Sequence, residues 1–371
     1  MVELSGDQGG GAPGGVSRSP PTELASVQYL RAAAALGVVV WHAQGQMGLK
    51  ETTVLQAGIE IFFVISGYVM WLILSRRPVS PATFLKKRLI RVVPLYWVLT
   101  SLMVGLLLVA PQLLQSARFD PAHIIASYLF VAWPNPAEGA GLKPVMIPGW
   151  TLNYEMFFYL ALAATLPLAA RRRAPILLGF LGILGAASLL PLPPVAHLYA
   201  SPFMLEFALG ILLALGLERL PERWKRQGPY GFVTGCSLLF IGGLLIDPQN
   251  HARLIAFALP ATLLIGGLVC WETHGRLPVL PWLKRIGDAS YPLYMIHPVL
   301  LSAMAQGWRA AGLTALSPWL FVAAGVVVTS LAGWALHVTL ERPLLAAFSP
   351  ARKTVGRSTT PPLIVSQRSR P

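Results

Sequence analysis

Charged residues and cysteines are both scarce in this sequence. Of its 371 residues only 12% are charged, and 15 acidic residues stand against 29 Lys and Arg. The two cysteines, Cys236 and Cys270, lie in apolar runs without the number or spacing of a disulfide framework or a metal site, so we expect packing residues. The seven histidines are scattered without acidic or cysteine neighbours at ligand spacing, and the sequence therefore predicts no metal centre.

Apolar residues dominate instead, at 55% of the chain. Runs near the ~20 residues that cross a bilayer recur from end to end, which predicts an all-α, polytopic transmembrane helical bundle. The first 25 residues lack the apolar core of a cleaved signal peptide, so the first span is expected to act as the targeting signal. We predict a disordered cytoplasmic tail over 1–25, a membrane domain over 26–345 and a basic disordered cytoplasmic tail over 346–371.

Basic residues indicate the topology, because Lys and Arg concentrate in cytoplasmic loops. We predict about ten spans with both termini in the cytoplasm, near 25–45, 54–74, 89–110, 149–170, 174–193, 201–217, 230–246, 252–271, 289–306 and 318–340. Of the 29 Lys and Arg, those then left on the outer side are Lys50, Arg118, Lys143, Arg253 and Arg309. The net charge of +14 thus reflects loop placement, and no nucleic acid is expected as a partner.

The apolar stretch from His123 to Trp133 is too short for a full span. If it crossed the membrane, every later basic cluster would move to the outer side. We therefore predict a re-entrant or outer-surface helix near 121–133, within an extended outer segment from Pro111 to Pro148.

Arg31 and His42 lie eleven residues apart in the first apolar run. Eleven residues at ~3.6 per turn return to within ~20° of the same helix face, so the two side chains would lie ~16 Å apart along one side. Ionisable residues inside a membrane are costly and are by default a functional hypothesis. The alternative is that Arg31 snorkels from the helix start while His42 lies at the opposite interface.

Two spans carry buried carboxylates. Glu60 in the second span needs a partner, for which we expect Arg31 or His42; otherwise it is hydrated near the outer interface. Glu155 would orient a histidine or hold a substrate hydroxyl, unless it is simply a charge at the outer mouth of its span. Tyr159 follows four residues later on the same face.

Other polar residues carry weaker signals. Ser66, followed by Gly67, is by itself typical of close helix packing. Glu206 is better explained by a buried ion pair than by catalysis. His297 follows Tyr294 by three residues on one helical face, although a lone histidine in a span is usually a packing hydrogen-bonder.

The basic loop after the second span permits two interpretations. Lys86 and Lys87 suit anionic lipid headgroups. Arg88 and Arg91, three residues apart at the start of a helix, are better candidates for the phosphates of a nucleotide-like donor, because arginine supplies forked donors.

Taken in order, these segments resemble the acyltransferase 3 family of integral-membrane O-acyltransferases, and most of all its exopolysaccharide-production branch. The resemblance covers roughly residues 26 to 345 and rests on LRAAAALGVVVWH, GIEIFFVISGYVM, FLKKRLIRVVPLYW, GWTLNYEMFFY, MLEFALG, SYPLYMIHP and the closing Glu341-Arg342-Pro343. Relatives often carry Asp in place of Glu60 and Phe in place of Tyr68. Some also carry a hydrolase-like domain after the membrane part; this chain ends too soon for one, so we expect the membrane domain to complete the transfer, alone or with a partner.

The resemblance implies transfer of an acyl group, usually acetyl from acetyl-CoA, to a sugar hydroxyl of a cell-surface glycan or its lipid-linked precursor. It implies a multi-pass protein of the bacterial cytoplasmic (inner) membrane. The expected partners are the bilayer, the glycan acceptor and exopolysaccharide assembly proteins.

The family motifs also imply roles for residues. Arg31 and His42 match the arginine and histidine of the first motif, and Arg88 and Arg91 match the basic motif. Glu155, Ser66 and the pair Tyr294 and His297 match further motifs, and Tyr159 is expected to line the site.

From these matches we expect Arg31, Arg88 and Arg91 to bind the donor and His42 to act as general base. Glu60 or Glu155 would orient its ring, as the carboxylate of a triad does. Direct transfer is the working hypothesis, while an acyl-enzyme on His42 or Ser66 stays open.

Two alternatives remain open. A transporter or flippase for lipid-linked sugars would use the same buried charges as a pathway, although we see no paired internal repeat with interrupted helices. An O-acyltransferase acting on a secondary metabolite such as a macrolide would keep the chemistry and change the acceptor.

Overall fold

The computed structural model describes residues 24–76, 78–114, 117–137, 139, 141–246, 252–274 and 277–348. Within these ranges the chain is helical and contains no strand, which confirms the all-α prediction. The predicted tails, 1–25 and 346–371, fall almost entirely outside the described residues.

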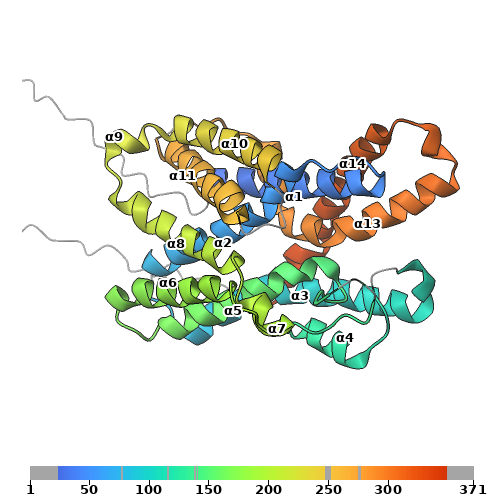
Figure 1. Cartoon of the computed structure of the whole chain (residues 1–371), viewed down its shortest axis with the longest axis horizontal. Coiled ribbons are helices and arrows are strands. Elements are labelled where there is room, and N and C mark those ends of the chain that lie inside the picture. The colour runs from blue at the N-terminus through green and yellow to red at the C-terminus, as the bar shows by residue number, and fades with distance from the viewer. Residues whose placement is uncertain are drawn as a thin grey trace, which may run out of the picture.

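Figure 1 shows the order of the helices. The α-helices are α1 (Ala25–Gln46), α2 (Gly58–Arg76), α3 (Pro81–Val109), α4 (Pro121–Tyr128), α5 (Trp150–Thr165), α6 (Ala170–Ala187), α7 (Pro194–Tyr199), α8 (Phe203–Arg219), α9 (Glu222–Lys225), α10 (Gly228–Leu245), α11 (Leu259–Thr273), α12 (Pro281–Asp288), α13 (Ser290–Ala310), α14 (Pro318–Leu336) and α15 (Arg342–Phe348). Short 3-10 helices are η1 (Thr53–Ala57), η2 (Pro111–Leu113), η3 (Ile147–Gly149) and η5 (Leu313–Ala315), and η4 (Leu254–Ala258) and η6 (His337–Glu341) are π-helices.

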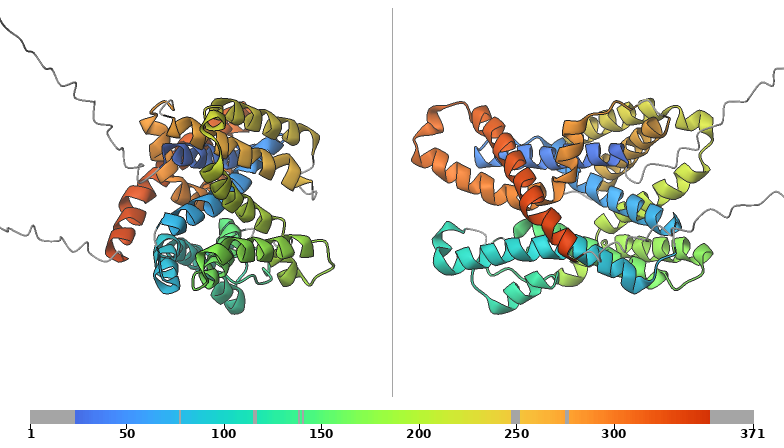
Figure 2. Two further views of the ribbon diagram at one scale, coloured as in Figure 1. Left: turned by 90° about the vertical axis from the view of Figure 1, so that its left-hand side faces the viewer. Right: turned by 180° about the vertical axis from the view of Figure 1, so that it is seen from behind.

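The helices form two groups that lie one above the other in Figures 1 and 2. In the upper group α1 contacts α11, α12, α13 and α14, and α10 packs along α11. The lower group holds α3, α4, α5, α6 and α7. Between them lie α2 and α8, which pack against each other, while α2 also contacts α1 and α8 contacts α6.

The contact between α2 and α8 depends on two glycines. A Cβ atom on Gly67 would lie 2.2 Å from the carbonyl oxygen of Phe207, and one on Gly210 would lie 2.2 Å from that of Val64. Real Cβ atoms do not approach this closely, so the two backbones touch because neither position has a side chain. The close packing expected at Ser66 and Gly67 is therefore present.

The first turn of α1 is capped by another helix. Glu272, near the end of α11, accepts hydrogen bonds from the backbone N–H of Ala25 (2.8 Å) and of Ser26 (2.9 Å) and from the Ser26 hydroxyl. These N–H groups have no partner inside their own helix, and a carboxylate also suits the positive end of the helix dipole. Glu272 thus fixes the start of the helix that carries Arg31 and His42.

Among the described residues, six helical segments are long and apolar enough to cross a membrane: Thr53–Ser75, Pro81–Val109, Pro194–Arg219, Gly228–Leu245, Leu254–Thr273 and Pro318–Phe348. Each overlaps one of the predicted spans. The other four predicted ranges hold α1, α5, α6 and α13, which are helical but do not meet that criterion. Ten crossings with cytoplasmic termini therefore stay a prediction.

The helix expected near 121–133 is shorter than predicted, because α4 ends at Tyr128. Asp120 begins it by accepting a hydrogen bond from His123 N at 2.7 Å, with Pro121 in the first turn. Its eight residues are too few to cross a bilayer.

Candidate functional site

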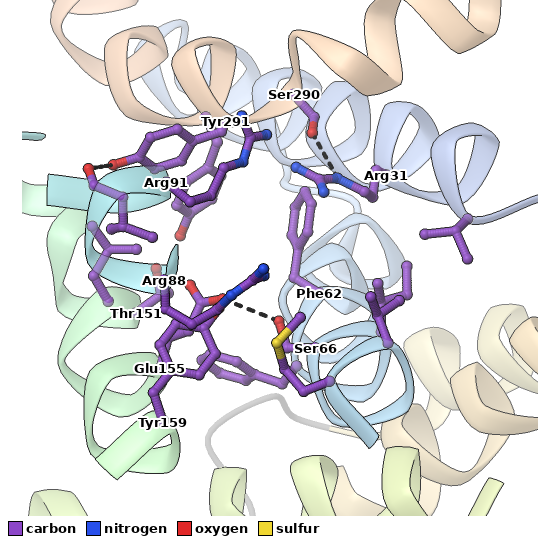
Figure 3. Close-up of a pocket in the computed structure, with 18 of the residues that line it drawn as sticks. Arg31, Phe62, Ser66, Arg88, Arg91, Thr151, Glu155, Tyr159, Ser290 and Tyr291 are labelled. Atoms are coloured by element: carbon purple, nitrogen blue, oxygen red, sulfur yellow. Dashed lines mark hydrogen bonds between the residues drawn. The ribbon is translucent and has the colours of Figure 1, made fainter. Parts of the chain in front are cut away.

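A cavity of about 350 Å³ lies between α1, α2, α3, α5 and α13 (Figure 3). Much of its wall is apolar and comes from α2, including Phe62, Val69 and Met70. Its other lining side chains include Gln28, Arg31, Ser66, Arg88, Arg91, Thr151, Glu155, Tyr159, Ser290, Tyr291 and Tyr294. The cavity thus brings together most of the predicted site residues, but His42, Glu60 and His297 are not among those that line it.

Glu155 is the carboxylate of this cavity. Its Oε1 accepts a hydrogen bond from the Ser66 hydroxyl at 3.2 Å and another from the Tyr159 hydroxyl one turn further along α5. Ser66 belongs to α2, so these contacts join two walls of the cavity through one oxygen (Figure 3). The structure brings together three residues that the sequence assigned to separate motifs or roles.

Arg31 enters the cavity from α1. Its Nε donates to the hydroxyl of Ser290 at 3.1 Å, and Ser290 is fully buried at the first position of α13 (Figure 3). This bond fixes the guanidinium at the cavity wall. Ser290 was not predicted from the sequence, although it is the first residue of the segment SYPLYMIHP. The available signal was a small hydroxyl residue at the start of a predicted span, where it could pair with an arginine inside the membrane.

Arg88 reaches the opposite wall from α3, and Figure 3 shows its guanidinium directed toward the cavity near Ser66. Its Nε is buried without a hydrogen-bond partner. A buried cationic donor without a partner is costly, so this group is suited to an anionic ligand.

Arg91 is already paired. It forms an ion pair with Glu341, which is 1% exposed and also accepts from His337 Nδ1 at 2.6 Å. Glu341 is the first residue of the Glu341-Arg342-Pro343 segment, for which no contact was predicted. Arg91 therefore holds η6 against α3 as well as lining the cavity.

The expectation that Glu60 pairs with Arg31 or His42 is wrong. Glu60, with no exposed surface, forms an ion pair with Nε of Arg253, which precedes η4 and was expected in an outer loop. The Arg253 guanidinium also lies over the ring of Phe203, 5.5 Å from its centroid. The physical reason is proximity: folding brings Arg253 against α2 from 193 residues away. Glu206 is also buried, at 1% exposed, and its predicted buried ion pair stays a prediction.

His42 and His297 form a pair beyond the cavity. Their ring centroids lie 4.9 Å apart, and His297 Nε2 is 3.4 Å from His42 Nδ1. The Tyr294 ring lines the cavity and lies 5.6 Å from the His297 ring. The ring of His42 is thus oriented by His297 and by the carbonyl oxygen of Val38 at 3.0 Å, and the expected orientation by Glu60 or Glu155 is not seen.

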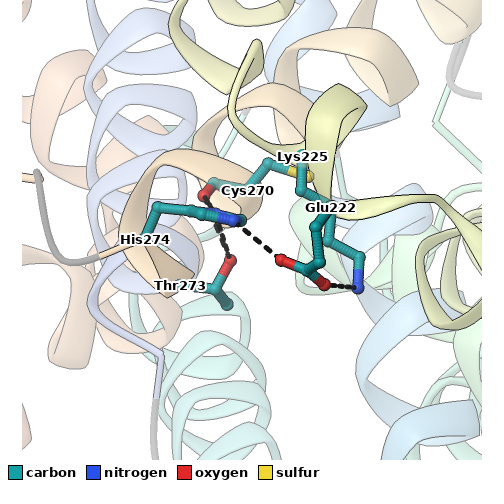
Figure 4. Close-up of polar contacts among 5 residues, drawn as sticks. All are labelled: Glu222, Lys225, Cys270, Thr273 and His274. Carbon is teal, nitrogen blue, oxygen red and sulfur yellow. Dashed lines mark hydrogen bonds and ion pairs between the residues drawn. The ribbon is translucent and has the colours of Figure 1, made fainter.

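A second polar cluster lies at the end of the molecule where α9 meets α11 (Figure 4). Glu222 binds Lys225 Nζ at 2.7 Å and His274 Nε2 at 3.1 Å, and His274 Nδ1 contacts the Cys270 carbonyl at 2.8 Å. The hydrogen bonds from Lys225 and His274 hold the pKa of the exposed Glu222 carboxyl below its usual value. The cluster joins α9 to the end of α11. In the described part of the chain, no group of three or more His, Cys, Asp and Glu is placed to hold a metal ion.

Apolar helices that surround a cavity lined by arginines and a carboxylate define a membrane protein with an internal polar site. An acyltransferase domain model matches residues 24–338, which is most of the chain and all of the elements that build the cavity. The chain therefore belongs to the acyltransferase 3 family.

Curated relatives agree with this assignment. The chain is 33% identical over 325 residues to the exopolysaccharide production protein ExoZ of Rhizobium meliloti (strain 1021), covering 86% of this chain and 98% of that protein. It is 27% identical over 312 residues to nodulation protein 10 of Rhizobium leguminosarum bv. viciae, covering 78% and 82%. No solved structure matches the chain.

Proposed function

We propose that the chain transfers an acyl group, which we expect to be acetyl, from acyl-CoA to a sugar hydroxyl of an exopolysaccharide or its lipid-linked precursor. The observation that carries this proposal is the cavity: arginines line it, and a histidine pair lies just beyond its Tyr294 wall. Family membership supports acyl transfer, and similarity to ExoZ, an exopolysaccharide production protein, supports a glycan acceptor. The bacterial cytoplasmic membrane and the assembly proteins of the glycan are the corresponding location and partners.

The donor would enter on the side of the arginines. Arg88 offers a buried Nε without a partner, and Arg31 is held at the opposite wall by Ser290, so both are suited to phosphate oxygens. A cavity of about 350 Å³ is at the small end of ligand pockets, which span ~300–1,000 Å³. It therefore suits the acyl-pantetheine arm, with the pyrophosphate at the arginines and the adenosine outside.

His42 would act as general base in direct transfer. It takes the proton of the acceptor hydroxyl as that oxygen attacks the acyl carbon, and the carbon–sulfur bond breaks. The proton on His42 then passes to the departing thiolate, so the products are the acyl ester and free CoA.

The two carboxylates would have different roles. Glu155 lines the cavity and orders Ser66 and Tyr159, so we assign it to the reaction site. Glu60 is fully buried and paired with Arg253, so we assign it a structural role.

The test is mass spectrometry of surface glycan from cells with and without the gene. The proposal predicts that deletion removes an acetyl increment from a sugar and that restoring the gene returns it. An unchanged glycan together with an unacylated metabolite would support the metabolite acyltransferase. Movement of the acceptor across vesicles without donor consumption would support the transporter instead.

A further inference from the structure

Pro298 interrupts the hydrogen-bonding pattern of α13 directly after His297. In a regular helix the N–H of residue 298 would bond to the carbonyl oxygen of residue 294, and proline has no N–H. The Tyr294 carbonyl oxygen is instead contacted by His297 Nδ1 at 2.7 Å. Because a carbonyl oxygen only accepts, Nδ1 of His297 carries the proton and its Nε2 carries a lone pair.

That lone pair lies toward His42. His297 Nε2 is 3.4 Å from His42 Nδ1, and the same Nδ1 is 3.0 Å from the Val38 carbonyl oxygen. Both neighbours are acceptors, so Nδ1 of His42 carries a proton shared between them. The neutral His42 ring then has its free lone pair on Nε2, the nitrogen that points away from the pair.

We propose that His297 is a positioning residue: held by the carbonyl that Pro298 leaves free, it keeps His42 in the tautomer whose Nε2 accepts the proton of the acceptor hydroxyl. This inference rests on the proposed function, which makes His42 the base. When Nε2 takes the proton, His42 still donates through Nδ1 to the same two acceptors, so the ring needs no rotation between accepting and releasing it.

Burial explains why a second histidine fits this role. His297 is 1% exposed and contacts both the Tyr294 ring and the His42 ring. A neutral imidazole fixes the orientation as the carboxylate of a triad does, without the cost of a buried charge in an apolar span.

The experiment compares full-length parental protein in vesicles with His297→Leu, which removes the acceptor, and His297→Gln, whose amide oxygen restores one. Leu300→Ala, one turn away and half-buried on the same helix, is the control for loss of packing. We expect His297→Leu to lower kcat about 10- to 100-fold, the range seen when an orienting partner is removed. His297→Gln should recover most of that loss, and KM for the donor should stay unchanged in both because His297 does not line the cavity.

A spectroscopic readout separates positioning from packing. In protein labelled with ¹⁵N-histidine, the His42 signals are identified by their loss in His42→Gln. We expect parental His42 to carry its proton on Nδ1 and His297→Leu to show a mixture of tautomers, with His297→Gln close to the parental spectrum.

The outcomes distinguish this inference from the proposed function. If His42→Gln keeps parental kcat, the base assignment fails and the inference fails with it. If His42→Gln is inactive but His297→Leu keeps both parental kcat and the parental tautomer, only the role of His297 is overturned. The role of His297 is also overturned if His297→Leu lowers kcat, His297→Gln does not restore it, and the His42 tautomer is the parental one in both.

Discussion

Arg88 and its neighbour Lys86 lie two residues apart on α3, yet only Arg88 lines the cavity. We expect Arg88→Met to raise KM for the donor about tenfold or more, since a hydrogen bond to a charged group contributes ~1.5–3 kcal/mol. Lys86 is exposed, so Lys86→Met is the matched control and should leave KM unchanged. Equal effects of the two substitutions in a donor titration would mean that Arg88 contributes only general positive charge.

The ion pair of Glu60 and Arg253 is expected to contribute to stability and not to catalysis. Removing one partner of a buried pair leaves an uncompensated charge, so Glu60→Gln should lower stability by ~3–5 kcal/mol. Protein that remains folded should keep kcat close to the parental value. Thermal unfolding in detergent and initial rates on the same sample measure both; a large loss of kcat without a loss of stability would restore Glu60 as a catalytic residue.

At the scale of helices, the crossing of α2 and α8 sets the position of Ser66. In Gly210→Ala the new methyl group would meet the Val64 carbonyl and separate the helices, which should cost ~1–3 kcal/mol. Gly216, on the same helix, has open space around it, so Gly216→Ala should be neutral or stabilising. Thermal unfolding of the two variants tests this directly, and equal stability would contradict the close approach.

Contacts within one helix could be predicted from the sequence, and contacts between distant helices could not. The spacing of Glu155 and Tyr159 follows from helical periodicity, and their hydrogen bond is present. The partners of Glu60, Arg91 and His42 lie 193, 250 and 255 residues away. The apolar pattern of a single sequence locates each helix but does not show which helices are neighbours. A helix face that contacts lipid and one that contacts another helix are both apolar, so the sequence does not distinguish them.

For the whole molecule, the predicted topology can be tested by labelling single cysteines from each side of the membrane. The start of α6 and the connection between α13 and α14 lie at opposite ends of the molecule in Figure 1. In a chain with Cys236 and Cys270 replaced by serine, we expect Thr314→Cys to react with an impermeant maleimide from outside the cell. Arg172→Cys should react only after the membrane is opened. Labelling of both from one side would contradict the assigned crossings.

In the proposed reaction, His42 takes the proton of a sugar hydroxyl that attacks the acyl group of a donor held on the arginine side. The most direct measurement is transfer of radiolabelled acetyl from acetyl-CoA to lipid-linked glycan in proteoliposomes, comparing parental protein with correctly inserted His42→Gln. Loss of a general base predicts a fall of ~10²–10⁴-fold. Transfer by His42→Gln at the parental rate would rule out His42 as the base.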